Sequence, residues 1–262
     1  MVVVTYHGHA CLELAGQAGK VVVDPFLAGN PLADCKADDI EVDAILVSHA
    51  HADHMGDAVS IAKRLEIPII GTAEVANYFQ SLGLRSHAMH IGGQHRFEFG
   101  RVRLTVAHHG NTTPDGRSLG LACGFVVDFE PTTVYFAGDT GLTLDMKLLD
   151  GVLETIDLAC LPIGGNFTMD IPDAVRAVEF INPRTVMPMH YGTWPVIEAD
   201  PYDFAKRVAC KTLVLKPGQS AQVGWRNPSG IVRRPARAGS TTEVGRHSSR
   251  QDGRSAPGAT RP

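Results

Sequence analysis

The chain has 262 residues, of which 44% are hydrophobic, and carries a formal net charge of −4 at pH 7. This length permits one large domain or two small ones, with enough chain for a sizeable core. No apolar run reaches the roughly 18 residues of a membrane-spanning helix, and the N-terminus lacks the pattern of a secretory signal. A membrane partner is therefore not expected.

Charge is distributed unevenly along the chain. Residues 227–262 contain seven arginines but only two acidic residues, and so carry +5, which leaves −9 for the rest. An acidic body argues against nucleic acid as a partner. The C-terminal segment is rich in Arg, Gly, Ser and Pro and has no hydrophobic periodicity, which is typical of disorder. We expect a folded domain over residues 1–226 and a disordered tail over 227–262.

The five cysteines are scattered and never form a C-x-x-C pair: Cys11, Cys35, Cys123, Cys160 and Cys210. That pattern favours reduced thiols in a cytoplasmic protein over a disulfide framework. Most of the cysteines lie in apolar surroundings, where a buried structural role is usual. We expect none of them to bind metal.

The first half of the chain is rich in short strands. Apolar and β-branched runs predict strands, and apolar residues at helical spacing predict helices. The strands are expected at 2–5, 11–14, 21–23, 44–47 and 67–70, the helices at 56–65 and 73–82, and two hairpins join 97–99 to 102–106 and 120–129 to 132–137.

The second half alternates helices and strands. Helices are expected at 144–153, 171–181 and 201–209, and strands at 157–161, 185–189, 213–215 and 221–223. Pro172 near the start of the second helix and Pro183 beyond its end fit the positions that proline favours. Two sheets packed face to face, with helices outside, bury these elements most economically. We predict an α+β fold, a four-layer αββα sandwich.

The segment His49-Ala50-His51-Ala52-Asp53-His54 is the most informative in the chain. Four side chains able to bind metal fall within six positions, directly after the apolar run 44–47. His49 and His51 point to the same side of an extended loop, and Asp53 and His54 follow where a helix is expected to begin. Gathering such groups is costly unless a cation neutralises and orders them. A solvated polar turn with three histidines is the less favoured interpretation.

Three further predicted strands also end in residues able to bind metal. They deliver His108 with His109, then Asp139, then His190. A lone histidine is more often structural than a ligand. Four strand ends with the same feature, if they share one edge of the sandwich, indicate a metal site there.

This order of residues resembles the metallo-β-lactamase-fold hydrolases. Six motifs narrow the resemblance: His7-Gly8-His9, Asp24-Pro25-Phe26, Met89-His90-Ile91-Gly92-Gly93, Ala137-Gly138-Asp139-Thr140, Leu161-Pro162-Ile163-Gly164 and Asn166-Phe167-Thr168-Met169. They resemble the small metal-dependent hydrolases of the UPF0173, or YtkL-like, family, which relate to L-ascorbate-6-phosphate lactonase. The resemblance covers about residues 2–224 and implies a metallo-β-lactamase-like sandwich.

The resemblance implies two metal sites that share one carboxylate. The first ion would be held by His49, His51 and His109, the second by Asp53, His54 and His190, and Asp139 would bridge them. Register with the family favours His109 over His108, although adjacent residues on a strand end point opposite ways and either could face inward. The cofactor would be two divalent metal ions, zinc first, with manganese or iron as alternatives.

The predicted activity is hydrolysis of a small-molecule ester, a lactone first and a phosphodiester second. Two divalent ions can share a water and lower its pKa towards about 7, which makes hydroxide available at neutral pH. Asp53 is the predicted catalytic residue, because it could orient that water and later carry a proton to the leaving group. Diiron redox chemistry is disfavoured, since such relatives place a carboxylate where this chain has His51. A non-catalytic metal-binding module is the remaining alternative.

Other residues have weaker signals. Asp24, after the strand 21–23, could hydrogen-bond a ligand histidine and fix its tautomer, or it could cap the turn before Pro25. Asn166 and Tyr191 lie on loops next to strand ends and are the predicted substrate-binding residues.

His7 and His9 have a structural role as their first interpretation, although one of them could line the pocket. Homo-oligomers are common among such enzymes, so a homo-oligomer is one expectation.

Overall fold

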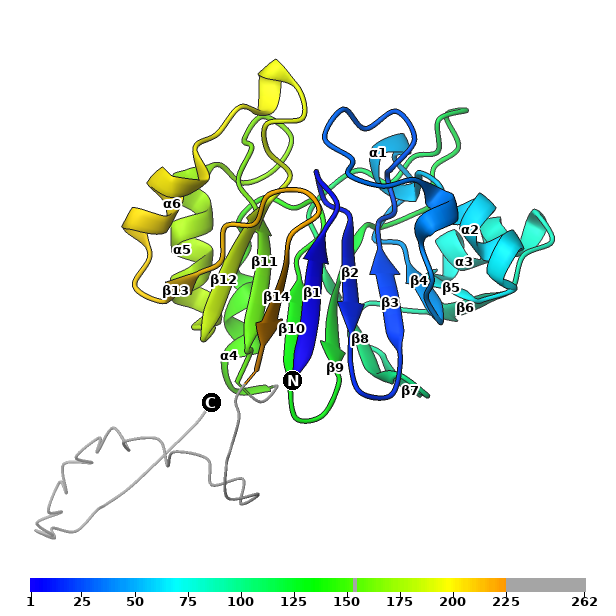
Figure 1. The fold of residues 1–262 in the computed structure, drawn as a ribbon, viewed down its shortest axis with the longest axis horizontal. Coiled ribbons are helices and arrows are strands. Elements are labelled where there is room, and N and C mark those ends of the chain that lie inside the picture. Colours follow the sequence, from blue (N-terminus) through cyan, green and yellow to red (C-terminus); the bar gives the residue numbers. More distant parts are fainter. Residues whose placement is uncertain (153–154, 225–262) are drawn as a thin grey trace, which may run out of the picture. The chain divides into compact units, whose positions relative to one another are not determined.

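The computed structural model describes residues 1–152 and 155–224. That part of the chain forms two seven-stranded mixed sheets, each covered by helices on its outer face (Figure 1). The predicted α+β fold, a four-layer αββα sandwich, is confirmed. The predicted tail, 227–262, lies outside the described residues, as do the last two residues of the predicted domain.

The first sheet has the strand order β14-β1-β2-β3-β4-β5-β6. Its strands are β1 (Val2–Tyr6), β2 (Leu12–Ala15), β3 (Lys20–Val23), β4 (Ala44–Leu46), β5 (Ile69–Thr72), β6 (Ser86–Met89) and β14 (Ser220–Val223). Pairing is antiparallel from β14 to β3 and parallel from β3 to β6. The helices α2 (Ala58–Leu65) and α3 (Ala73–Ser81) cover its outer face.

The second sheet has the strand order β13-β12-β11-β10-β9-β8-β7. Its strands are β7 (Gln94–Phe97), β8 (Gly100–Val106), β9 (Cys123–Asp128), β10 (Thr133–Phe136), β11 (Leu158–Pro162), β12 (Thr185–Met189) and β13 (Lys211–Thr212). Pairing is antiparallel from β7 to β10 and parallel from β10 to β13. The helices α4 (Leu149–Val152), α5 (Ile171–Ile181) and α6 (Pro201–Arg207) lie on its outer face.

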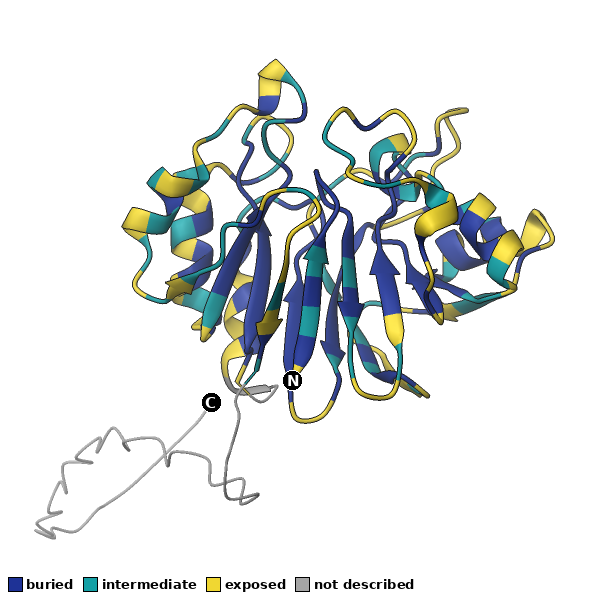
Figure 2. Cartoon of the chain, in the orientation of Figure 1, coloured by how far each residue is buried: buried dark blue, intermediate teal, exposed yellow. Residues whose placement is uncertain are grey.

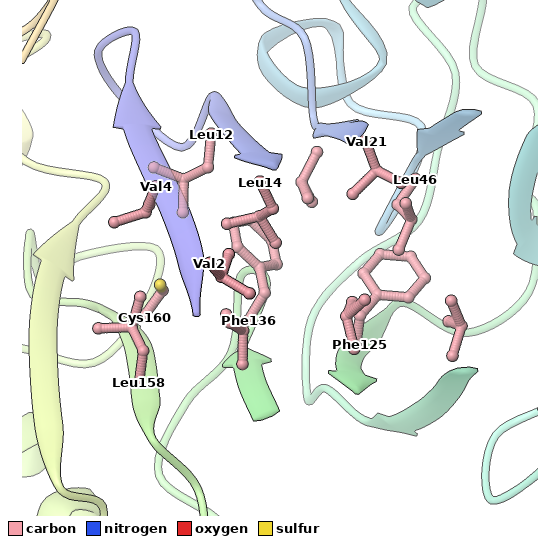
Figure 3. Close-up of a cluster of buried hydrophobic side chains, with 14 of the residues drawn as sticks. Val2, Val4, Leu12, Leu14, Val21, Leu46, Phe125, Phe136, Leu158 and Cys160 are labelled. Carbon is pink, nitrogen blue, oxygen red and sulfur yellow. The ribbon is translucent and has the colours of Figure 1, made fainter. Parts of the chain in front are cut away.

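Three apolar layers hold the sandwich together, and the strands are buried on both faces over much of their length (Figure 2). The central layer lies between the sheets and includes Val2, Leu14, Phe125, Phe136 and Leu158 (Figure 3). A second layer packs β4 and β5 against α2 and α3, and a third packs β11 against α5 and α6. Burial on this scale is the main source of the stability of such a fold.

The structure divides the predicted helix 56–65 into two. A single turn, α1 (Ala52–Met55), precedes α2, and the chain turns at Gly56 with φ +38°. A Cβ at Gly56 would lie 2.4 Å from the carbonyl oxygen of Pro25, so only glycine fits there. The turn at Gly56 therefore separates α1 from α2.

Other boundaries also differ from the predictions. The sequence does not predict β6, because Ser86-His87-Ala88-Met89 contains no β-branched residue. The β7–β8 turn lies at 98–99, before the predicted Gly100-Arg101, and the predicted strand 213–215 is replaced by the shorter β13. The predicted helix 144–153 begins as a 3₁₀ helix, Leu144–Leu148, continues as α4, and its last residue lies outside the described residues.

No helix in residues 1–152 and 155–224 is long and apolar enough to cross a membrane.

The central layer offers a test of the packing. Replacing Phe125, which is fully buried, with alanine should lower the free energy of unfolding by about 3–5 kcal/mol, since it removes apolar contacts and leaves a cavity. Phe167, 53% exposed, is the matched control, and its replacement by alanine should change that energy by less than about 0.5 kcal/mol. Urea unfolding of both variants measures the difference, and equal effects would contradict the described packing.

Candidate metal centre

The predicted ligand residues meet at one edge of the sandwich. They follow the ends of β4, β8, β10 and β12, and α1, which carries Asp53 and His54, lies at the same edge (Figure 1). Asp139 is at the middle of the group: its Oδ2 lies 3.0 Å from His190 Nε2, 3.2 Å from His54 Nε2 and 3.5 Å from His109 Nε2. Four strand ends and one helical turn therefore present their side chains to a common volume.

The first subset consists of three histidines. One ring nitrogen from each of His49, His51 and His109 lies within 4.8 Å of the others. His49 Nε2 is 3.0 Å from His51 Nδ1, and the His109 ring centroid is 5.0 and 5.1 Å from those of His49 and His51. Three neutral imidazoles at such distances could hold one divalent ion.

The second subset surrounds Asp53. Its Oδ2 lies 3.8 Å from His54 Nε2 and 4.0 Å from His190 Nε2. His9 joins this subset, with Nε2 3.2 Å from the same oxygen, so four residues offer atoms within 4.8 Å of one another. Asp139 faces His109 of the first subset and His54 and His190 of the second, so its carboxylate lies between the two.

Several buried polar atoms in this region have no hydrogen-bond partner, and these atoms show whether the residues fit a metal ion. His54 Nε2, Asp139 Oδ1 and both ring nitrogens of His190 are buried and make no hydrogen bond. His54 Nε2 and His190 Nε2 lie about as close to Asp139 Oδ2 as hydrogen-bonded atoms, but without the geometry of a hydrogen bond. Buried polar groups are normally satisfied, and a cation among these atoms would satisfy them. The His and Asp donors present suit zinc and also manganese or iron.

Burial and charge set the protonation states of the group. Burial lowers the pKa of His49, His51 and His109, which keeps these rings neutral at pH 7 and able to bind metal. Burial also opposes charge on His54 and Asp139, but their mutual attraction dominates. It raises the pKa of His54 and, together with His190, holds the pKa of Asp139 well below its usual range.

Asp24 contacts the ligand loop from behind. It is fully buried, and its Oδ2 lies 2.7 Å from His54 Nδ1 and accepts a 2.5 Å hydrogen bond from Ser48 Oγ. Ser48 Oγ is in turn 2.9 Å from His49 Nδ1. Because a carboxylate only accepts, His54 Nδ1 donates a hydrogen bond to Asp24, and the Ser48 hydroxyl, which gives its own hydrogen to Asp24, accepts a hydrogen bond from His49 Nδ1. The Nε2 atoms of both rings are left to face the centre.

Two backbone constraints fix the loops around the ligands. Asn111 accepts a hydrogen bond from Ala50 N, between His49 and His51, and donates to the carbonyls of Leu119 and Leu121. Gly138, directly before Asp139, has φ +66°, and a Cβ there would lie 2.7 Å from the Cys123 carbonyl oxygen. The carboxylate of Asp139 therefore depends on a position that only glycine fits.

The structure separates the two adjacent histidines after β8. His109 faces the centre, 3.5 Å from Asp139, whereas His108 is exposed and uses its backbone N–H to donate to Thr140 Oγ1. The sequence left open which of the two histidines faces inward, and in the structure His109 does so.

The predicted substrate-binding residues lie on loops of the same edge, and Tyr191 directly follows the predicted ligand His190. Asn166 is exposed with φ +51°, beside the exposed Phe167. Tyr191 is half-buried and packs against the layer that contains Phe204, and burial raises the pKa of its hydroxyl to about 12.

Sequence reasoning gave His9 a structural role first, with lining the pocket as the alternative, and it did not select Thr193 as a site residue. His9 is fully buried beside Asp53, and its Nδ1 lies 2.7 Å from Thr193 Oγ1. The available signal was position: His9 follows the end of β1 as His49 follows the end of β4.

Comparison with known proteins agrees with this geometry. A family model described as "Beta-lactamase superfamily domain" matches residues 3–190. The αββα sandwich with a His and Asp centre at its edge defines the class: the chain is a metal-dependent hydrolase of the β-lactamase fold.

Relatives narrow the class to a family. A UPF0173 metal-dependent hydrolase from Bacillus cereus strain B4264 is 47% identical over 223 residues, which cover 83% of this chain and 98% of that protein. One from Natranaerobius thermophilus is 48% identical over 220 residues, covering 82% and 97%. The chain belongs to the family of UPF0173 metal-dependent hydrolases.

Solved structures show the same fold. Igni18, a metallo hydrolase from the archaeon Ignicoccus hospitalis, is 31% identical with a TM-score of 0.78, covering 86% of this chain and 99% of its own. An isothiocyanate hydrolase from Delia radicum gut bacteria, 21% identical with a TM-score of 0.67 over 84% of this chain and 98% of its own, shares the fold alone.

The Asp24 contacts generate a prediction. Replacing Asp24 with asparagine should weaken metal binding by about 10–100-fold, because His54 loses the carboxylate that fixes its tautomer. Asp115→Asn, at a fully exposed carboxylate, is the control and should leave affinity unchanged. Competition with a chromophoric zinc chelator measures both, and an unchanged affinity in Asp24→Asn would show that the contact does not support a ligand.

Proposed function

We propose that the chain is a binuclear metal-dependent hydrolase that acts on a small-molecule ester, with a lactone as the first candidate. The observation that carries the proposal is the group of buried nitrogen and oxygen atoms around Asp139 that lie about as close as hydrogen-bonded atoms but make no hydrogen bonds. Such atoms need a partner in a folded protein, and a divalent cation supplies one for all of them at once.

The ligands divide into two sets in this proposal. His49, His51 and His109 would hold the first ion, Asp53, His54 and His190 would hold the second, and Asp139 would be shared between them. The position of Asp139 between His109 on one side and His54 and His190 on the other supports the shared role. The predominance of imidazole favours zinc, and the carboxylates leave manganese and iron as alternatives.

When bound, two divalent ions supply hydroxide at neutral pH and polarise the oxygen under attack. The two carboxylates nearest the histidines, Asp139 and Asp53, differ in their exposure to solvent. The Asp139 side chain is 3% exposed and is committed to the histidines around it, whereas the Asp53 side chain is 26% exposed. Asp53 is therefore the carboxylate that can orient water and carry a proton to a leaving group, which assigns it the catalytic role.

The charge of the site discriminates between substrate classes. The segments that carry the predicted ligands and their neighbours, 7–9, 24–34, 48–57, 107–113, 138–143, 163–170 and 190–198, contain no lysine or arginine, whereas Arg117 and Lys216 lie further along loops of the same edge. Phosphate groups are usually bound by such cations. The exposed side chains Phe167 and Val196 lie on two of these segments and offer apolar contact. An uncharged ester or lactone therefore fits better than a phosphodiester or a phosphorylated lactone.

Asn166 and Tyr191 orient this substrate in the proposal, since both lie on loops of the site edge. The proposed partner is a small molecule, neither nucleic acid nor membrane, and the cytoplasmic location and homo-oligomerisation remain predictions. A non-catalytic metal-binding module is disfavoured because all seven predicted ligands are present and meet in one place.

Metal content and removal test the proposal directly. The purified chain should contain about two ions, and a chelator should abolish hydrolysis of lactones until zinc, manganese or iron is restored. Mass spectrometry gives the content, and a panel of uncharged lactones, carboxylic esters and phosphodiesters gives the class. Metal binding without turnover of any of them would refute the activity, and preference for phosphodiesters would refute the substrate class.

The adjacent histidines provide a matched pair of variants. His109→Ala should lose metal from the first set and reduce turnover by at least about 100-fold, since a ligand next to Asp139 is removed. His108→Ala removes an exposed imidazole one residue away and should keep both. Equal metal content and kcat in the two variants would contradict the ligand assignment.

A further inference from the structure

His9 occupies a strained and fully enclosed position beside the proposed second metal set. Its side chain is fully buried, and its backbone is in the left-handed region, with φ +56°. Its carbonyl oxygen accepts hydrogen bonds from His190 N, at 2.8 Å, and from the hydroxyl of Tyr6, at 3.2 Å. A buried non-glycine residue in this conformation persists only where its surroundings hold it.

The surroundings also fix the ring. The His9 centroid lies 4.2 Å from that of His190, 5.1 Å from that of Trp194 and 5.7 Å from that of Phe26. Neighbours on several sides leave the imidazole little freedom to turn. The direction of its two nitrogens is therefore a fixed property of the fold.

Each nitrogen of His9 has one partner. Nδ1 lies 2.7 Å from Thr193 Oγ1, and Nε2 lies 3.2 Å from Asp53 Oδ2. A carboxylate can only accept, so the single proton of the neutral ring belongs on Nε2. Nδ1 is then an acceptor, and the Thr193 hydroxyl donates to it. Asp53 thereby selects the tautomer, and Thr193, which is 6% exposed, supports it by donating to Nδ1.

This geometry separates His9 from the metal ligands near it. The Nε2 atoms of His54 and His190 lie close to carboxylate oxygens without hydrogen-bond geometry, whereas His9 Nε2 meets Asp53 in a proper hydrogen bond. A nitrogen that carries a proton has no lone pair for a metal. His9 therefore contacts the centre through Asp53 and does not bind the ion itself.

We propose that His9, with its tautomer supported by the Thr193 hydroxyl, is a positioning residue that holds the Asp53 carboxylate beside His54 and His190. Asp53 needs such support, because it lies on the single turn α1 and its side chain is partly open to solvent. The inference rests on the proposed role of Asp53 as ligand and proton carrier. It adds a chain of hydrogen bonds that runs from Thr193, in the loop after β12, through His9, after β1, to the Asp53 carboxylate.

Two pairs of variants in the full chain test the proposal. His9→Asn keeps a side chain that tolerates the left-handed backbone but is too short to reach Asp53, and His9→Gln restores a donor at longer reach. Thr193→Val removes the hydroxyl at constant shape, and Thr193→Ser restores it. Thermal unfolding identifies any variant that fails to fold.

Zinc affinity and kinetics provide the first readouts. His9→Asn should weaken the second zinc by about 10–100-fold and lower kcat with little change in KM, and His9→Gln should recover most of both. Thr193→Val should show a smaller loss that Thr193→Ser reverses. Wild-type affinity for both ions and wild-type kcat in His9→Asn would overturn the proposal.

Nitrogen NMR of histidine-labelled protein provides a readout that does not depend on metal or turnover. The signal that disappears in His9→Asn should show a neutral ring protonated on Nε2 in the metal-free protein, and Thr193→Val should shift it towards a mixture of tautomers. Protonation on Nδ1, or loss of the Nε2 proton when zinc is added, would make His9 a ligand and overturn the proposal. If the wild type hydrolyses nothing, the proposed function fails, while the tautomer and zinc affinity still decide the role of His9.

Discussion

The fold depends on how the Asp139 carboxylate is accommodated in a buried position. An isolated buried carboxylate is expensive, and here three imidazole nitrogens approach it within 3.5 Å. Those nitrogens come from the ends of three elements that are distant in sequence. The charge of Asp139 is therefore balanced only when the elements of both sheets are in place.

Hydrogen bonds behind the ligands convert this charge balance into a fixed geometry. Asp24 and Ser48 direct His49 and His54, and Asn111 holds the loop between His49 and His51. These groups are buried, so each bond would leave an unsatisfied partner if it broke. A site preorganised in this way would bind a cation without the cost of ordering loops, whereas its substrate specificity depends on the loops around it.

Local patterns predicted most of the fold and much of the site, and the failures have physical reasons. Apolar and β-branched runs predicted the strands, and the density of ligand types in 49–54 predicted the centre. β6 was not predicted because its residues have low strand propensity, and the break at Gly56 depends on a carbonyl of a distant loop. The contact of His9 with Thr193 joins residues 184 positions apart, so no local pattern could reveal it. Likewise, only tertiary register distinguishes His109 from His108.

The central claim is that one carboxylate, Asp139, serves two metal ions held by the ends of four strands. A crystal structure of the zinc-loaded protein, with anomalous scattering measured on both sides of the zinc absorption edge, tests it most directly. Two zinc peaks are expected, one among His49, His51 and His109 and one among Asp53, His54 and His190, with Asp139 in contact with both. A single peak, or two peaks that Asp139 does not touch, would contradict it.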